Sequence, residues 1–229
     1  MIDVLASPVI NESSKGLSSR RVLIFDLYGT LVDWRMSIGS FITLHAGREF
    51  VDLFFECDIR EVAHYRPYSE VLSTCIREVL RVAGVEASQE LVEAFILSFA
   101  KSPPFPDTIH GLMVLRKQGF KVAVLSNTER RLIDITLCGF KHLFNNIITA
   151  EDVKAYKPSI DAFKQAYRIL GVEPREVVHV SAYPQYDLIP ASRLGAGTVL
   201  LDRGLGYNWS TRVKSLHELS LILSSSIDQ

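Results

Sequence analysis

Short apolar runs and helical periodicity alternate along most of the chain. Five runs rich in β-branched residues predict β-strands, at 22–25, 122–125, 146–149, 177–180 and 198–201. Between the later runs lie segments whose apolar positions recur at helical spacing, at 108–117, 130–138, 160–170 and 188–194. Strands that alternate with helices of this length are typical of a mostly parallel, doubly wound sheet. We therefore predict a fold of the α/β class.

One long connection interrupts this alternation. Residues 35–103, between the first and second predicted strands, show only amphipathic helical patterns, for example at Leu72, Ile76 and Val79. The connection is too long for a simple crossover. The consecutive prolines Pro103 and Pro104 cannot continue a helix and mark the return to the sheet. We predict a helical domain at 35–103 inserted into a core domain formed by 21–34 and 104–229, with a flexible leader at 1–20.

Composition and charge exclude several classes of protein. The 229 residues are 48% hydrophobic and 22% charged, which is enough to build a globular core, and the net charge of −1 favours neither nucleic acid nor membrane as a partner. No apolar run can span a bilayer and the N-terminus lacks a signal-peptide pattern, so we expect a cytoplasmic location. Cys57, Cys75 and Cys138 show no C-x-x-C spacing, and we expect buried free thiols with no disulfide framework and no metal site.

Polar side chains follow the predicted strands at their carboxyl ends. In open α/β sheets this edge binds ligands, and a carboxylate there can act as a covalent nucleophile. Asp26 directly follows the first strand and is the candidate nucleophile. The full candidate set is Asp26, Thr30, Ser126, Asn127, Lys157, Ser181, Tyr183 and Asp187.

Most of these residues also have a structural explanation. Asp26, the Ser126–Asn127 pair and Asp187 are all good helix N-caps. Lys157 could be a solvated loop residue, and Tyr183 with Tyr186 could serve packing alone. Trp34 is expected to be a packing anchor.

The order of these features resembles the haloacid dehalogenase superfamily, whose four motifs are a strand-end Asp, a strand-end Ser or Thr, a Lys and a terminal acidic loop. The resemblance covers the chain except the leader. An insertion after the first motif forms a cap over the active site in that superfamily. The resemblance therefore implies that 35–103 is such an α-helical cap domain.

Two positions indicate the branch of the superfamily. Tyr28 stands where its phosphatases carry a second Asp as general acid, and Ala182 stands where they carry an Asp that holds Mg²⁺. Magnesium requires oxygen ligands, which alanine lacks. The segments 26–31 and 153–158 resemble the L-2-haloacid dehalogenases, the metal-independent branch. This implies hydrolytic dehalogenation of a small carboxylic acid with no cofactor, and Mg²⁺ only for a phosphatase.

The resemblance also implies roles for the residues. Asp26 would attack C2 of a 2-haloacid, and Lys157 would keep Asp26 ionised. Thr30, Ser126 and Asn127 would hydrogen-bond the carboxylates of enzyme and substrate, while Asp187 would position Lys157 or the hydrolytic water. The expected substrate-binding residues are Tyr28, Arg48, Tyr68, Ser181 and Tyr183, with Arg60 and Arg66 as rivals of Arg48 for the cap arginine.

The fourth motif departs from the dehalogenase pattern, because Asp187 stands one position later than in those enzymes. Two other functions therefore stay open. The first is a Mg²⁺-dependent phosphatase of the same fold, with Asp26 and Asp187 near the metal. The second is a catalytically degenerate member retained as a binding protein, and a homodimer is also considered.

Overall fold

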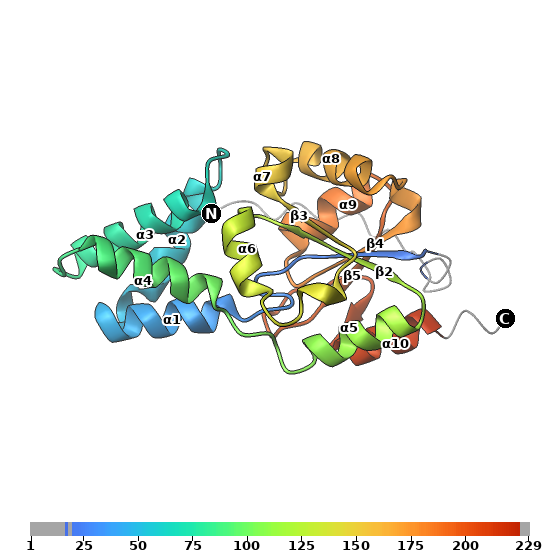
Figure 1. Ribbon diagram of the computed structural model, residues 1–229, viewed down its shortest axis with the longest axis horizontal. Helices are drawn as coiled ribbons and strands as arrows, with labels where there is room; N and C mark the ends of the chain where they lie inside the picture. Colours follow the sequence, from blue (N-terminus) through green and yellow to red (C-terminus); the bar gives the residue numbers. More distant parts are fainter. Residues whose placement is uncertain (1–16, 18–19, 225–229) are drawn as a thin grey trace.

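Six parallel strands form one sheet at the centre of the computed structural model, which describes residue 17 and residues 20–224 (Figure 1). Their order across the sheet is β3-β2-β1-β4-β5-β6, so the direction of winding reverses between β1 and β4. The predicted doubly wound α/β sheet is confirmed. The strands are β1 (Val22–Phe25), β2 (Lys121–Ser126), β3 (Asn146–Thr149), β4 (Val177–Ser181), β5 (Gly197–Leu201) and β6 (Arg212–Val213).

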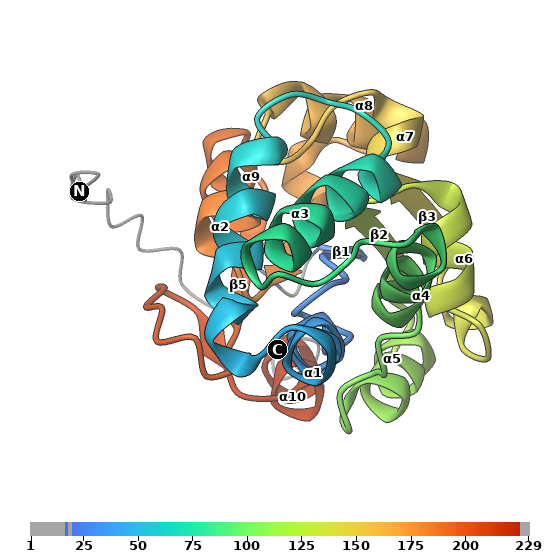
Figure 2. The same ribbon diagram turned by 90° about the vertical axis from the view of Figure 1, so that its left-hand side faces the viewer.

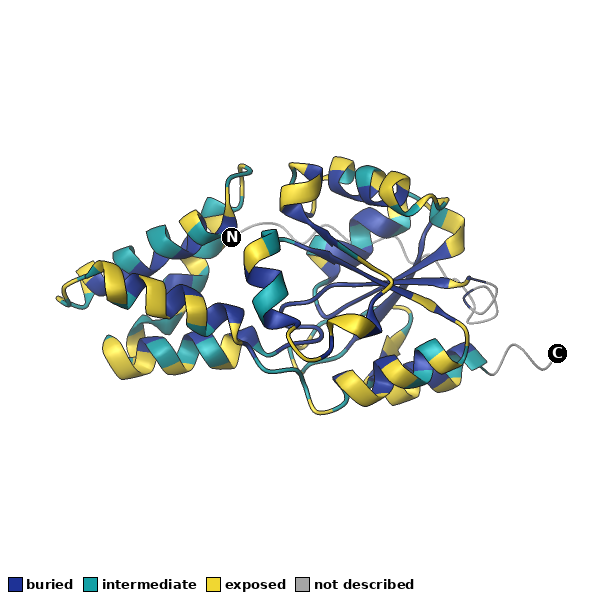
Figure 3. Ribbon diagram, in the orientation of Figure 1, coloured by how far each residue is buried: buried dark blue, intermediate teal, exposed yellow. Residues whose placement is uncertain are grey.

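Helices cover both faces of this sheet because successive strand residues point to opposite sides. On one face, Leu23 and Phe25 belong to the same buried cluster as residues of α5 (Thr108–Lys117), α6 (Arg130–Thr136) and α10 (Leu216–Ser224). On the other face, Val22 and Ile24 cluster with residues of α7 (Ala150–Val153), α8 (Ile160–Leu170) and α9 (Ile189–Arg193). The strands β1, β4 and β5 are buried along their whole length, and β2 is buried except at Lys121 (Figure 3).

A second group of helices lies beyond one end of the sheet (Figures 1 and 2). It consists of α1 (Trp34–His45), α2 (Val51–Glu61), α3 (Tyr68–Val82) and α4 (Gln89–Ala100), with a 3-10 turn at Arg48–Phe50. These four helices are called the cap below. The segment that enters the cap and the segment that leaves it lie side by side. The Asp33 N–H donates to Pro103 O (2.8 Å), and the Phe105 N–H donates to Leu31 O (3.0 Å). The cap is therefore attached through a short pair of hydrogen-bonded linkers.

The cysteines differ from the sequence-based expectation. Cys57 of α2 and Cys75 of α3 form a disulfide, and Cys138 is free and exposed. The prediction of buried free thiols without a disulfide was wrong because two helices adjacent in the cap bring together cysteines that lie 18 residues apart.

The predicted leader at 1–20 falls mostly outside the described residues. Leu17 and Arg20, which are described, are buried. Arg20 Nη1 donates to the carbonyl oxygens of Val177 (3.0 Å) and Gly195 (3.2 Å), so the carboxyl end of this segment is hydrogen-bonded to the core. Within the described part of the chain, no helix has the length and apolarity that a bilayer crossing requires.

Candidate active site

The strand pairing brings the predicted site residues to one edge of the sheet. Phe25 of β1 pairs with Val124 of β2 and with Val180 of β4, and the Asp26 N–H donates to Val180 O (3.1 Å). Asp26, Ser126 and Ser181 therefore meet at the carboxyl ends of three adjacent strands, beside the reversal of winding where open sheets bind ligands. A cavity of about 190 Å³ lies between this edge and the cap.

A buried lysine joins two carboxylates at the floor of the cavity. Lys157 Nζ donates to Asp26 Oδ1, to Asp187 Oδ1 and to Leu125 O, each at 2.8 Å. Burial disfavours the ammonium, but the charges of Asp187 and Asp26 outweigh it and raise the pKa of Lys157. Thr30 Oγ1 donates to Asp26 Oδ2 (2.6 Å). Asp26 is thus held as an oriented carboxylate, as a nucleophile requires.

Asp187 reaches Lys157 from a π-helical turn, Pro184–Leu188. Its Oδ2 accepts a hydrogen bond from Ser181 Oγ (3.0 Å), and burial followed by the charge of Asp26 raises its pKa. A π-turn holds one more residue than an α-turn. It therefore accommodates the extra residue that separates Ser181 from Asp187, and the ion pair with Lys157 forms despite the altered spacing. Ser181 lies beneath Asp187 and does not line the cavity, contrary to its expected contact with substrate.

Ser126 and Asn127 both line the cavity but differ in their partners. Asn127 Nδ2 donates to Lys157 O (2.8 Å), and the Lys157 N–H donates to Asn127 Oδ1 (2.7 Å), so the amide holds the lysine loop. This differs from the expected contact with the carboxylates of enzyme and substrate. Ser126 Oγ is buried and has no hydrogen-bond partner among the described residues. An unpaired buried hydroxyl is costly, which suits a group that pairs with substrate.

Tyr28 lines the cavity with its ring, while its hydroxyl points away toward α6. The hydroxyl is 2.6 Å from Thr136 Oγ1, and burial raises its pKa. The next residue, Gly29, has φ +84°, and a Cβ there would lie 2.1 Å from the Tyr183 hydroxyl oxygen. Gly29 is thus required both by the turn and by the approach of Tyr183. Tyr183 accepts a hydrogen bond from Trp34 Nε1 (3.3 Å), and burial raises its pKa to about 12.

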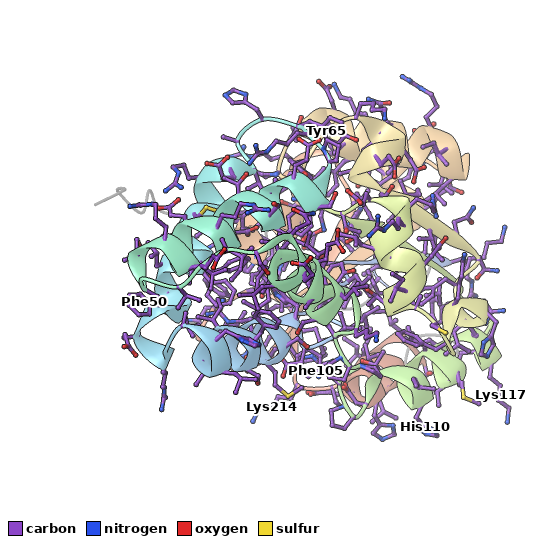
Figure 4. All side chains as sticks on the ribbon, turned by 60° about the vertical axis from the view of Figure 1, so that its left-hand side comes forward. Phe50, Tyr65, Phe105, His110, Lys117 and Lys214 are labelled. Carbon is purple, nitrogen blue, oxygen red and sulfur yellow. A yellow bond between two sulfur atoms is a disulfide. The ribbon has the colours of Figure 1, made fainter. Side chains whose placement is uncertain are left out.

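The arginine that the cap contributes is Arg35. It lines the cavity from the first turn of α1, with its guanidinium 4.0 Å from the centroid of the Phe55 ring. Arg48 does not line this cavity, so that prediction was wrong. It follows the other end of α1, a helix of 12 residues and hence about 18 Å long. Its turn ends at Phe50, which lies at the outer edge of the cap (Figure 4).

The rival arginines do not line the cavity either. Arg60 pairs with Glu78 (2.7 Å) and Arg66 with Glu61 (2.6 Å). Tyr68 does line it, as predicted, and its hydroxyl donates to Asp58 Oδ1 (2.8 Å).

Sequence reasoning missed eight residues that line the cavity. One of them carried a signal: the Asp33 side chain accepts a hydrogen bond from the Met36 N–H, and this N-cap places Arg35 in the first turn of α1. The others depend on how the cap and the loops pack. The eight are Trp34, Arg35, Phe55, Asp58, Ile59, Val62, Tyr186 and Tyr207.

The donor set at this edge does not fit Mg²⁺. Lys157 lies between the two carboxylates that would have to bind the ion, and Ala182 provides no side-chain oxygen. The Ala182 N–H instead donates to Thr30 Oγ1 (3.0 Å). In the described part of the chain, no group of three or more His, Cys, Asp or Glu side chains is arranged to hold a metal.

Comparison with known proteins identifies the family. The family model described as haloacid dehalogenase-like hydrolase matches residues 20–195. Glyceraldehyde 3-phosphate phosphatase of Methanopyrus kandleri is 29% identical over 198 residues, which cover 80% of this chain and 84% of the relative. (S)-2-haloacid dehalogenase 4A of Burkholderia cepacia is 26% identical over 197 residues, which cover 82% and 85%.

The solved structures agree on the fold. The L-2-haloacid dehalogenase of Xanthobacter autotrophicus with chloropropionic acid covalently bound superposes with a TM-score of 0.78 at 17% identity, over 89% of this chain and 98% of that one. The matched range includes Asp26, Ser126, Lys157 and Asp187, all of which meet at one cavity. The chain belongs to the haloacid dehalogenase-like hydrolases.

Proposed function

We propose that this hydrolase removes halide from a small 2-haloacid, without a metal, through an ester formed on Asp26. The proposal depends on the identity and the contacts of Tyr28. In the phosphatases of the family, this position holds the general acid that protonates the leaving group. Here it holds a tyrosine whose hydroxyl is hydrogen-bonded to Thr136. A halide is a stable anion and needs no proton donor, whereas an alkoxide leaving group does.

The reaction would proceed in two steps. A carboxylate oxygen of Asp26 attacks C2, the carbon–halogen bond breaks, and the halide leaves with the bonding electrons. A water molecule then attacks the carboxyl carbon of the ester. The C2 oxygen leaves as the hydroxyl of a 2-hydroxy acid, Asp26 is regenerated, and one proton is released with each halide. Lys157 holds and orients the Asp26 carboxylate for the first step.

Two groups are available to bind the substrate carboxylate. Arg35 carries a positive charge at the cavity, and the Ser126 hydroxyl is unpaired among the described residues. The dehalogenase relative from Burkholderia cepacia and the covalent chloropropionic acid complex from Xanthobacter autotrophicus support this substrate class. The homodimer and the cytoplasmic location stay predictions of the sequence.

Chloride release tests the proposal directly. Purified protein in EDTA is incubated with L-2-chloropropionate or chloroacetate, and rapid quenching followed by mass spectrometry of the Asp26 peptide detects the ester. We expect chloride release with wild type and none with Asp26→Asn. Absence of chloride together with EDTA-sensitive hydrolysis of p-nitrophenyl phosphate would overturn the proposal.

A phosphatase is the second candidate, and the relative from Methanopyrus kandleri favours it. The cation between Asp26 and Asp187 argues against it. A binding protein without activity would give neither chloride nor phosphate and no ester on Asp26.

A further inference from the structure

A second carboxylate faces the cavity from the cap and has no part in the chemistry above. Asp58 of α2 is half-buried and lines the cavity. Its Oδ1 accepts the hydrogen bond from Tyr68, but no described residue donates to its Oδ2 or forms an ion pair with it. Burial raises the pKa of Asp58 to about 6, against the opposing effect of the Tyr68 hydrogen bond. At neutral pH it is therefore mostly a carboxylate that lacks a cation.

Aromatic residues share the cavity with this carboxylate. Tyr68, Tyr186 and Tyr207 line the same cavity, and burial together with the charge of Asp58 raises the pKa of Tyr186. An ammonium group has three donors and no acceptor, and it is attracted both by a carboxylate and by the faces of aromatic rings. The walls around Asp58 thus have the chemistry of an ammonium site. A haloacid without an amino group carries only a negative charge, and the Asp58 carboxylate would repel it.

The cavity also contains the complementary charge. Arg35 lies over Phe55 and is available for a substrate carboxylate. We propose that the preferred substrate is zwitterionic, with a carboxylate bound by Arg35 and an ammonium group bound by Asp58 and its tyrosines. It would be a small 2-haloacid that also carries an amino group. The inference rests on the proposed function only for the reacting carbon–halogen bond.

Ligands that cannot react test the recognition of the ammonium group separately from dehalogenation. Lactate and isoserine (3-amino-2-hydroxypropanoate), in the same spatial arrangement at C2, share a carboxylate and a hydroxyl and differ by one ammonium group. Isothermal titration calorimetry at pH 7.5 gives their dissociation constants for wild type, Asp58→Asn and Asp52→Asn. Asp52 lies on the same helix, is exposed and does not line the cavity, so it is the matched control. Thermal unfolding verifies that each variant is folded.

We expect wild type and Asp52→Asn to bind isoserine at least roughly tenfold more tightly than lactate, the scale of one hydrogen bond to a charged group. In Asp58→Asn the ratio should fall to about one. Equal or tighter binding of lactate by wild type, or an unchanged ratio in Asp58→Asn, would overturn the inference. So would lactate binding that tightens below pH 6 without any preference for isoserine, because Asp58 would then act as a protonated donor. Chloride release from L-2-chloropropionate is measured separately, so a failure of dehalogenation and a failure of ammonium recognition are distinguishable.

Discussion

Lys157 holds together two buried carboxylates, and its replacement by methionine should destabilise the protein in a pH-dependent way. The exposed fractions of the side chains are 2% for Lys157, 9% for Asp26 and 2% for Asp187. Methionine has a similar length and no charge, so Lys157→Met leaves two carboxylates facing each other without a cation. Breaking a buried ion pair by removing one partner costs about 3–5 kcal/mol.

The stability lost in Lys157→Met has an upper limit, because one of the two carboxylates can take up a proton and so remove the repulsion. Moving a proton at pH 7 onto a carboxyl whose ordinary pKa is about 3.9 costs about 1.4 kcal/mol for each of roughly three pH units, or about 4 kcal/mol. At pH 5 the same step costs about 1.5 kcal/mol. Burial already raises the pKa of Asp187 in wild type, where the charge of Lys157 opposes the rise. Without that charge the carboxyl pKa rises further, so the folded variant binds a proton more fully than folded wild type does. Its deficit in the free energy of unfolding should therefore shrink as the pH falls from 7 to 5.

Urea unfolding at pH 7 and pH 5 measures this deficit for Lys157→Met, Asp187→Asn and the double variant. Because Asp187→Asn removes one of the two repelling charges, it should restore stability in the Lys157→Met background and reduce it in wild type. Lys141→Met is the control: Lys141 is exposed and pairs with exposed Asp134, so the loss should stay below about 1 kcal/mol. A deficit that does not change with pH, or additive effects in the double variant, would refute the reasoning.

Three further predictions concern other parts of the molecule. Arg35→Ala should lower kcat/KM for L-2-chloropropionate by roughly tenfold or more, while Arg48→Ala should change it by less than about twofold. A larger loss in Arg48→Ala than in Arg35→Ala would contradict the assignment of Arg35 as the cap arginine at the cavity. Burial lowers the pKa of His179 to about 3, so the folded protein stays neutral there while the unfolded chain binds a proton below pH 6.5. Wild type should thus lose about 1.5 kcal/mol more unfolding free energy than His179→Gln between pH 6.5 and 5, and parallel curves would contradict this. Thiol titration of denatured protein should find Cys138 alone before reduction and all three cysteines after it; three thiols before reduction would exclude the disulfide.

The core could be predicted from the sequence because its signals are local. Each strand except β6 is a run of apolar, β-branched residues, and the predicted ends differ from the observed ones by at most one residue. The placement of Asp26 and Ser126 follows from one rule, that the carboxyl ends of parallel strands share an edge. β6 has only two residues and gives no such pattern.

The cap could be predicted only as a set of helices. Which face of α1 or α2 turns toward the sheet depends on packing between segments distant in sequence, and periodicity does not record it. The choice of Arg48, with Arg60 and Arg66 as its rivals, failed for this reason, and so did the expectation of unpaired cysteines. The π-turn that brings Asp187 to Lys157 is likewise invisible in the spacing, which instead suggested an altered motif.

The charges of the site explain why the cap has to take part in substrate binding. Lys157 directs its three donors to Asp26, Asp187 and Leu125 O, so none remains for a substrate. When both carboxylates are ionised, the trio of side chains carries a net charge of −1, from two carboxylates and one ammonium, and by itself it repels an anionic substrate. Among the described residues that line the cavity, the cations are Arg35 and Lys157, and Arg35, at the first turn of the cap, is the one that pairs with no carboxylate and can offset this repulsion. In the proposed mechanism, an anionic substrate would therefore bind when the linkers at Asp33 and Phe105 hold α1 over the sheet edge. The position of the cap would then be a condition for the attack by Asp26.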